Sequence, residues 1–245
     1  MIIFISPAKG FSSVDRKPVS TPVFIDEAKT IMNTLSSLST EDISNAMKVK
    51  DNIAQLNKER FSDFKFDSDG QPALLTYDGM QYKNIKAFEF SDEDIDFAMK
   101  HLRILSALYG VLKPLDSIYP YRLDFLTKLK VGDFNNMYNF WNDKIYSELS
   151  TDSDGVIVNL ASDEYSKAVK KYLEDEKYIT CTFKVNKNGT YKVQSTASKK
   201  ARGMMVNYII KNKITDFRKL VDFSEDGYTY SFELSSEDEF IFVKD

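Results

Sequence analysis

The sequence predicts a single compact α/β domain over residues 1–245, with a mixed β-sheet and helices packed around it. Two apolar runs, Met1–Ile5 and Gly155–Ala161, have the length and composition of buried strands. Stretches with apolar residues at helical spacing separate these two runs. Two hairpins expected near the carboxyl end must pair antiparallel, so we expect a mixed sheet and not a doubly wound parallel one.

The chain after the first strand is predicted to be mostly helical. Apolar residues follow helical spacing from Phe24, and the helical region extends toward Phe61. Ser39 and Asp42 have the spacing of a capping box, in which each side chain bonds the other residue's backbone amide at a helix start. Short strands are expected around residues 73–77.

The clearest helix opens at Ser91 with a second capping box. Apolar residues at helical spacing continue to Leu108, and Gly110 follows as a stop. Residues 101–112 therefore resemble a helix-hairpin element whose tight turn offers backbone amides to a nucleic-acid phosphate. From the residues alone we favour the simpler interpretation, in which the Tyr109-Gly110 turn is an ordinary helix end.

The second half of the chain is predicted to interleave helices and strands. Tyr138–Leu149 should be a helix that buries the single tryptophan, Trp141. Ser162 follows the second buried strand and can cap another helix. The remaining elements are a hairpin turning at Asn188-Gly189, a helix over Ser198–Asn212, and a closing hairpin of Tyr228–Leu234 with Phe240–Val243.

Composition excludes several classes of protein. Cys181 and His101 are the only cysteine and the only histidine, which rules out an internal disulfide and most metalloenzyme layouts. We therefore expect no metal centre, and no cofactor motif occurs. The chain opens on MIIFI without a basic leader, and its apolar runs are too short to span a bilayer, so we expect a cytoplasmic protein with no membrane partner. The net charge of −4 gives no global attraction to nucleic acid.

Local charge is uneven, and the sharpest anomaly is the expected helix start at Ser198. Lys199, Lys200 and Arg202 lie in its first turns, although cations near the positive end of a helix dipole are unfavourable. An anion would offset them, because free backbone amides and basic side chains together bind phosphate or carboxylate. We interpret the segment as an anion site; the alternative is a solvated basic turn.

Other candidate residues follow the predicted strands. Asp163 and Glu164 fall in the first turn of a helix, where they could act as general acid and base or bind a divalent cation. From these residues alone we favour the simpler interpretation, in which both acids complement the helix dipole. Lys9 lies at a strand exit, where open α/β sheets bind ligands, or is simply an exposed loop lysine. Lys113 and Arg122 follow the proposed helix-hairpin element.

Several short motifs occur in a characteristic order along the chain. They are ISPAK at residues 5–9, FSDED at 90–94, HLR at 101–103, LYGVL at 108–112, PYRL at 120–123, NLASDEY at 159–165 and KKARG at 199–203. In order and spacing the sequence resembles the YaaA family of peroxide-stress proteins from about Met1 to Tyr230.

The YaaA resemblance implies a cytosolic bacterial protein that limits free iron and the oxidative damage it drives. It also implies a single α/β domain with a helix-hairpin-helix-like element and a basic cleft linked to DNA binding. Lys113 stands where family members can have arginine, which keeps the charge but loses bidentate geometry. Carried onto this sequence, the residues around the cleft are Lys9, Arg103, Tyr109, Gly110, Arg122, Asp163, Glu164, Lys200 and Arg202.

Two functional hypotheses follow, and the sequence leaves open whether the protein is an enzyme. In the first, which we favour from the sequence, a long groove binds DNA phosphates through Lys9, Arg103, Lys113, Arg122, Lys199, Lys200 and Arg202. In the second, an enclosed pocket of Lys9, Asp163, Glu164, Lys200 and Arg202 acts on a phosphorylated small molecule or nucleotide. Direct iron storage would need several converging histidine, cysteine or carboxylate ligands, so we expect any effect on iron to be indirect.

Overall fold

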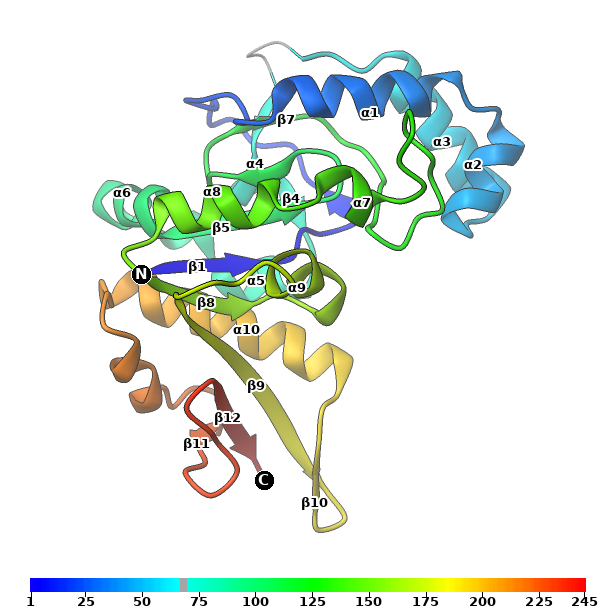
Figure 1. Ribbon diagram of the computed structural model, residues 1–245. Coiled ribbons are helices and arrows are strands. Elements are labelled where there is room, and N and C mark those ends of the chain that lie inside the picture. The colour runs from blue at the N-terminus through cyan, green and yellow to red at the C-terminus, as the bar shows by residue number, and fades with distance from the viewer. Residues whose placement is uncertain (67–69) are drawn as a thin grey trace.

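The computed structural model describes residues 1–66 and 70–245 (Figure 1). Within these residues the fold is the expected single α/β domain, with eight strands in one mixed sheet and helices around it. The sheet has the order β11 (Thr229–Tyr230), β12 (Glu239–Lys244), β9 (Lys177–Lys187), β8 (Val156–Leu160), β1 (Ile2–Ile5), β5 (Leu102–Ser106) and β6 (Gly110–Leu112), and β10 (Thr190–Lys192) pairs with β9.

The centre of the sheet is parallel and its edges are antiparallel. β1 runs parallel to both β5 and β8, and β9 runs parallel to both β8 and β12. The short strands β6, β10 and β11 add as antiparallel neighbours, which confirms the two predicted hairpins and the mixed sheet. Every residue of β1 is buried, as expected for a strand covered on both faces.

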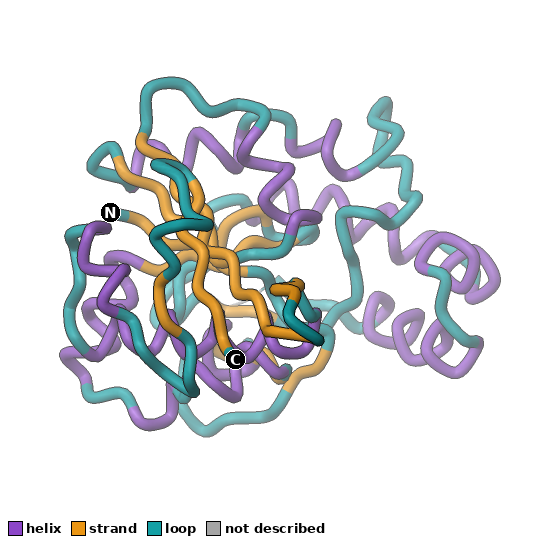
Figure 2. The backbone as a smooth tube through the Cα atoms, turned by 90° about the horizontal axis from the view of Figure 1, so that it is seen from below, coloured by secondary structure: helices purple, strands orange, loops and turns teal. Residues whose placement is uncertain are grey.

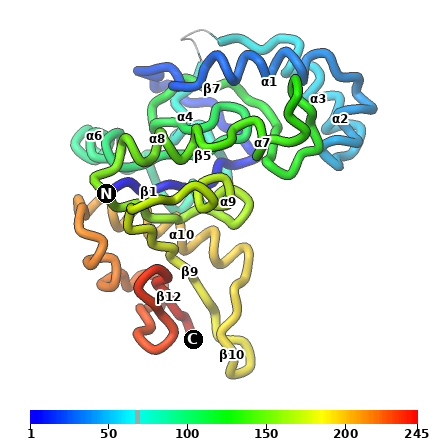
Figure 3. The backbone as a smooth tube through the Cα atoms, in the orientation of Figure 1, coloured from blue at the N-terminus to red at the C-terminus, as the bar shows by residue number. Residues whose placement is uncertain are grey.

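The helices surround this sheet. The amino-terminal third forms the upper part of the molecule as drawn and the carboxyl-terminal third the lower part (Figure 3), while a view turned by 90° shows the strands running through the middle (Figure 2). The helices are α1 (Ile25–Ser37), α2 (Thr40–Met47), α3 (Asp51–Ser62), α4 (Ala73–Thr76), α5 (Met80–Ile85), α6 (Asp92–His101), α7 (Met137–Trp141), α8 (Lys144–Asp152), α9 (Asp163–Lys170) and α10 (Ser195–Lys211), with 3-10 turns at Ala87–Glu89 and Phe217–Asp222. Two small ladders pair β2 (Gly10–Phe11) with β4 (Tyr77–Asp78), and β3 (Gln71–Pro72) with β7 (Ser117–Ile118).

Local capping signals predicted helix starts well. Ser39 opens α2 and Ser91 opens α6, and both form complete capping boxes with the acidic residue three positions on. Trp141 is fully buried, as predicted, and its indole Nε1 donates to the carbonyl of Ala107 at 2.8 Å. The helix predicted over residues 138–149 is divided at Asn142, whose positive φ of 46° separates α7 from α8.

The prediction that the helix starting at Ser91 continues to Leu108 is wrong. α6 ends at His101, and the following residues form β5 and then β6, an antiparallel hairpin inside the sheet. Both faces of β5 are covered, so its apolar residues do not alternate with polar ones and fall at helix-like spacing. Residues 101–112, expected to be a helix-hairpin element, are therefore mostly a β-hairpin. Residues 73–76, expected as strand, form the short helix α4.

The sheet topology opens a crevice beside β1. After β1 the chain reaches its next parallel neighbour, β5, on one side, whereas after β8 it continues to β9 on the other side. The connections leaving the carboxyl ends of β1 and β8 therefore diverge, and open α/β sheets bind ligands at such a point. No helix in the described part of the chain is long and apolar enough to cross a membrane.

Candidate functional site: a cationic pocket at the ends of β1 and β8

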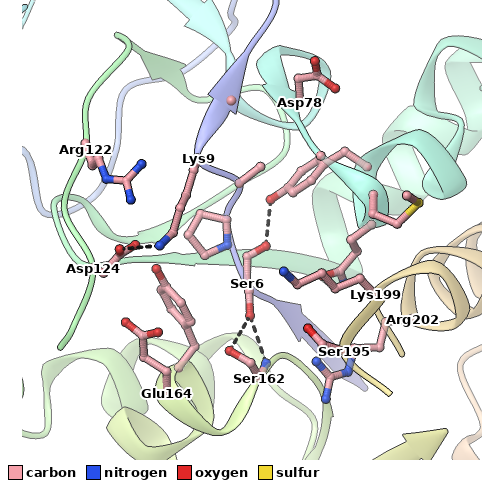
Figure 4. Close-up of a pocket in the computed structure, with 18 of the residues that line it drawn as sticks. Ser6, Lys9, Asp78, Arg122, Asp124, Ser162, Glu164, Ser195, Lys199 and Arg202 are labelled. Carbon is pink, nitrogen blue, oxygen red and sulfur yellow. Dashed lines mark hydrogen bonds and ion pairs between the residues drawn. The ribbon is translucent and has the colours of Figure 1, made fainter. Parts of the chain in front are cut away.

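A pocket of about 500 Å³ lies at the carboxyl ends of β1 and β8 (Figure 4). Five separate stretches of chain meet there, so the pocket exists only in the folded domain. They are the exit of β1 (residues 6–10), the segment from β4 into α5 (78–82), the loop after β7 (121–124), the start of α9 (162, 164 and 165) and the start of α10 (195, 199 and 202).

Ser6 joins two of these stretches at the centre of the pocket. Its Oγ accepts a hydrogen bond from the amide of Ser162 at 2.9 Å and donates to the Ser162 hydroxyl at 3.3 Å. The hydroxyl of Tyr82 donates to the carbonyl of Ser6 at 2.9 Å. Ser162 thus occupies the predicted N-cap position of α9, but its side chain bonds Ser6 and makes no capping bond.

Two arginines from different elements line the pocket. Arg122 comes from the loop after β7 and Arg202 from α10. The Nε of each is buried and has no hydrogen-bond partner among the described residues. Burial lowers the pKa of Arg202, because a desolvated guanidinium loses water without gaining an acceptor. An anion in the pocket would supply the missing acceptors.

The acidic residues of the pocket are mostly neutralised by lysines. Lys9 Nζ lies 2.8 Å from Asp124, and Lys83 Nζ lies 3.3 Å from Asp78. Glu164 forms no ion pair within the described residues; one of its oxygens accepts from the amide of Leu126 at 3.3 Å. Burial, together with the nearby charge of Asp124, raises the pKa of Glu164. The uncompensated charge of the pocket is therefore positive.

Tyrosine rings form much of the remaining wall, at Tyr82, Tyr121 and Tyr165. The hydroxyl of Tyr121 is 2.7 Å from both the Ser106 Oγ and the Tyr77 hydroxyl. Burial raises the pKa of Tyr121 to about 12, so this hydroxyl is neutral at physiological pH. Neutral rings beside free cations suit a ligand that has both a flat part and an anionic part.

The structure brings five of the residues singled out from the sequence into this one pocket. They are Lys9, Arg122, Glu164, Lys199 and Arg202. Helix α10 begins three residues before the predicted start, at Ser195, so Lys199 and Arg202 lie in its second turn and not at its first amides. Figure 4 shows the Lys199 side chain directed toward Ser6.

Neighbouring residues on the same helices lie elsewhere. Asp163 lines a second groove of about 870 Å³, bordered by α9, β9 and the start of β12. Lys200 points away from the pocket and forms an ion pair with Asp226 at 3.0 Å.

The residues from the expected helix-hairpin element are part of the domain interior. Arg103 is 3% exposed, and its Nε donates to Asp152 at 2.6 Å. Tyr109 is 1% exposed, and its hydroxyl accepts from the amide of Tyr119 at 3.1 Å. Gly110 has a φ of 70° and packs against Trp141. Lys113 is half-buried, and its amide donates to Asp116 at 2.7 Å.

Sequence reasoning missed several residues that shape the pocket, above all Ser6, Asp124, Tyr82 and Ser195. Ser6 belongs to the ISPAK motif beside Lys9, and Asp124 directly follows the PYRL motif. Their positions within or next to a motif were thus the sequence signal that could have identified Ser6 and Asp124 as pocket residues. Within residues 1–66 and 70–245, no group of three or more histidine, cysteine or acidic residues is arranged to hold a metal ion. Cys181 is buried, which raises the pKa of its thiol to about 12.

Comparison with known proteins identifies the family. The model of a family described as "Peroxide stress protein YaaA" matches residues 1–234. The chain belongs to this family. A UPF0246 protein of Clostridioides difficile strain 630 is 51% identical over the full length of both chains. UPF0246 proteins of Ligilactobacillus salivarius (41% identity, full length of both) and Alteromonas mediterranea (39% identity, all of this chain and 98% of that one) are also similar.

The motifs that resemble the YaaA family surround the pocket in this member. Residues 5–9, 120–123, 159–165 and 199–203 all contribute side chains to its lining. The HLR and LYGVL motifs instead form β5, β6 and the turn between them, beneath Tyr121. The resemblance noted from sequence is confirmed, and four of its motifs meet at the pocket.

Proposed function

We propose that this member of the YaaA family binds a phosphorylated small molecule or nucleotide in the pocket between β1 and β8, as part of a peroxide-stress response. One observation carries the proposal: Arg122 and Arg202 each bury an Nε without a partner among the described residues, at a pocket whose aspartates are already paired with lysines. A buried guanidinium N–H without an acceptor is costly, and an anionic ligand in the pocket offers acceptors to such groups.

The shape of the site supports the same reading. The cavity of about 500 Å³ is within the range of small-molecule sites and lies at a topological switch point of the sheet. The first amides of α10, at Ser195 and the two residues after it, have no partner within the helix, and Ser195 lines the pocket. A phosphate near Lys199 would also lie toward the positive end of that helix.

DNA binding in a basic cleft, which the YaaA resemblance implies, is the second candidate. It is favoured by exposed lysine side chains near the pocket, since Lys9 is 60% and Lys200 is 42% exposed. It has less cationic surface than the sequence predicted, because Arg103 lies in the interior. The connection to iron that the resemblance implies also remains a prediction, and we propose that it is indirect.

A matched pair of adjacent lysines tests the two candidates. Binding of nucleoside monophosphates and inorganic pyrophosphate would be measured by calorimetry, and binding of duplex and single-stranded DNA by fluorescence anisotropy across salt concentrations. Lys199→Gln should weaken nucleotide binding about tenfold, while Lys200→Gln, outside the pocket, should leave it unchanged.

If DNA is the ligand of an open surface, both substitutions should reduce its affinity and flatten its salt dependence by similar amounts. If none of the phosphate compounds binds the unmodified protein, the proposed function is overturned.

A further inference from the structure

Two of the three carboxylates that line the pocket, Asp124 and Glu164, lie apart from the cations of α10. In Figure 4, Asp124 and Glu164 lie on one side of Ser6 with Lys9 and Arg122, whereas Lys199 and Arg202 lie on the other. The third carboxylate, Asp78, is paired with Lys83. The electrostatic neighbours agree with this division, because Glu164 is influenced by Asp124 and Lys9, whereas the acid that acts on Arg202 is Asp163. A ligand whose phosphate binds near Arg202 would therefore present another part of itself to the carboxylates.

The two carboxylates also have contrasting environments. Asp124 forms an ion pair with Lys9 Nζ at 2.8 Å. Glu164 is half-buried, has no cationic partner among the described residues, and feels the charge of Asp124, which together raise its pKa. A carboxyl group with a raised pKa on the same side of a pocket as a second, ion-paired carboxylate is a common arrangement for acid and base catalysis.

The position of this pair argues against chemistry at the phosphate. Carboxylates next to the phosphate would repel it, and phosphoryl transfer depends chiefly on cations placed around the transferred group. The reactive bond should instead lie in the part of the ligand beside the tyrosine rings. In a nucleotide, that part contains the glycosidic bond, which is cleaved through an oxocarbenium-like transition state by a proton donor and a carboxylate.

We propose that the pocket hydrolyses the glycosidic bond of a nucleoside 5′-monophosphate, with Glu164 as general acid and Asp124 as general base; this rests on the proposed function. The bond between the sugar C1′ and the base nitrogen breaks, and its electron pair remains on the nitrogen, which takes the proton of Glu164. Water forms the new C1′–O bond and gives a proton to Asp124. The products are a free base and a pentose 5-phosphate, and exchange with solvent restores both carboxyl groups.

The experiment incubates the full-length protein with each common ribonucleoside and deoxyribonucleoside 5′-monophosphate and separates the products by liquid chromatography. We expect release of free base from at least one nucleotide and no release of inorganic phosphate. Glu164→Gln and Asp124→Asn should each lower the rate about 100-fold or more, while nucleotide affinity by calorimetry stays within a few-fold of the unmodified protein.

The control is Glu174→Gln, which makes the same kind of change at an exposed acid outside the pocket. It should keep the rate of base release, and thermal unfolding should show that all the variants are folded.

If nucleotides bind and no base is released, this inference is overturned and the proposed function stands; if none binds and none is cleaved, both are overturned. Phosphate release in place of base release, or full activity in Glu164→Gln, also overturns the inference.

Discussion

The hydroxyl of Ser6 accepts a hydrogen bond from the backbone amide of Ser162 at 2.9 Å and thereby connects the exit of β1 to the start of α9. These two residues are 156 positions apart in the sequence and lie at the ends of neighbouring parallel strands. The pocket is built around this contact, with the cations of α10 on one side and Asp124 and Glu164 on the other.

Removing the hydrogen bond between Ser6 and Ser162 should lower both the stability of the fold and its affinity for the ligand. Ser6→Ala leaves the amide of Ser162 without an acceptor, which should lower the free energy of unfolding by about 1–3 kcal/mol. Urea denaturation would measure this, and calorimetry the loss of nucleotide affinity. Ser162→Ala keeps the amide donor and removes only the weaker contact at 3.3 Å, so it should cost clearly less. Equal losses in the two variants would contradict the role assigned to Ser6.

Replacing Arg202 should separate stability from binding. The Arg202 guanidinium is largely desolvated, and its Nε lacks an acceptor among the described residues. Arg202→Met should therefore raise the free energy of unfolding of the ligand-free protein by about 1 kcal/mol. The same substitution should abolish phosphate binding. Urea denaturation with and without pyrophosphate gives both values. Arg202→Lys, which keeps the charge but not the fork of donors, should bind with intermediate affinity. A loss of stability in Arg202→Met would show that the guanidinium is satisfied in the ligand-free fold.

Gly110 provides a steric test of the β5–β6 turn. A Cβ at this position would lie 2.7 Å from the Trp141 ring, and the φ of 70° is already unfavourable for other residues. Gly110→Ala should therefore lower the free energy of unfolding by about 2–4 kcal/mol, adding a clash to backbone strain. Gly155→Ala, with a φ of 88° but nothing within 4 Å, carries the strain alone and is the matched control. Similar thermal shifts in both variants would mean that the packing against Trp141 is unimportant.

Asp94 should make the fold sensitive to acid. Burial alone would raise its pKa, but hydrogen bonds from Lys211 and Lys213 outweigh burial and hold the pKa well below the usual range. The resulting stability is fully present above the unfolded-state value of about 4 and is lost as the pH falls toward the lowered folded value. Urea denaturation between about pH 2 and pH 6 should show this loss in the unmodified protein and a flatter profile in Asp94→Asn.

Elements encoded by local signals were predictable from the sequence. The capping boxes at Ser39 and Ser91 depend only on residues three positions apart, and the turn at Asn188-Gly189 depends on two neighbours. β5 was misread because a strand buried on both faces lacks the alternation that distinguishes strand from helix. That distinction depends on what packs over the segment, and the segment's own sequence does not contain it.

The sequence predicted that the candidate site is charged, but not which of two adjacent charged residues lines the pocket. Lys199 and Lys200, like Asp163 and Glu164, are adjacent on a helix, where successive side chains point about 100° apart. The start and orientation of each helix decide which member of a pair enters the pocket. Asp124 was missed because nothing near it in sequence indicates that its partner is Lys9, more than a hundred residues earlier.

The meeting of five chain segments at one pocket gives a bound ligand a mechanical role. A molecule bound between Arg122 and Arg202 would contact several of the connections that diverge from the sheet. Its binding would stabilise these loops against local unfolding. Occupancy should then slow amide hydrogen exchange in segments as distant in sequence as residues 6–10 and 195–202, and the protein would be most rigid when its ligand is abundant.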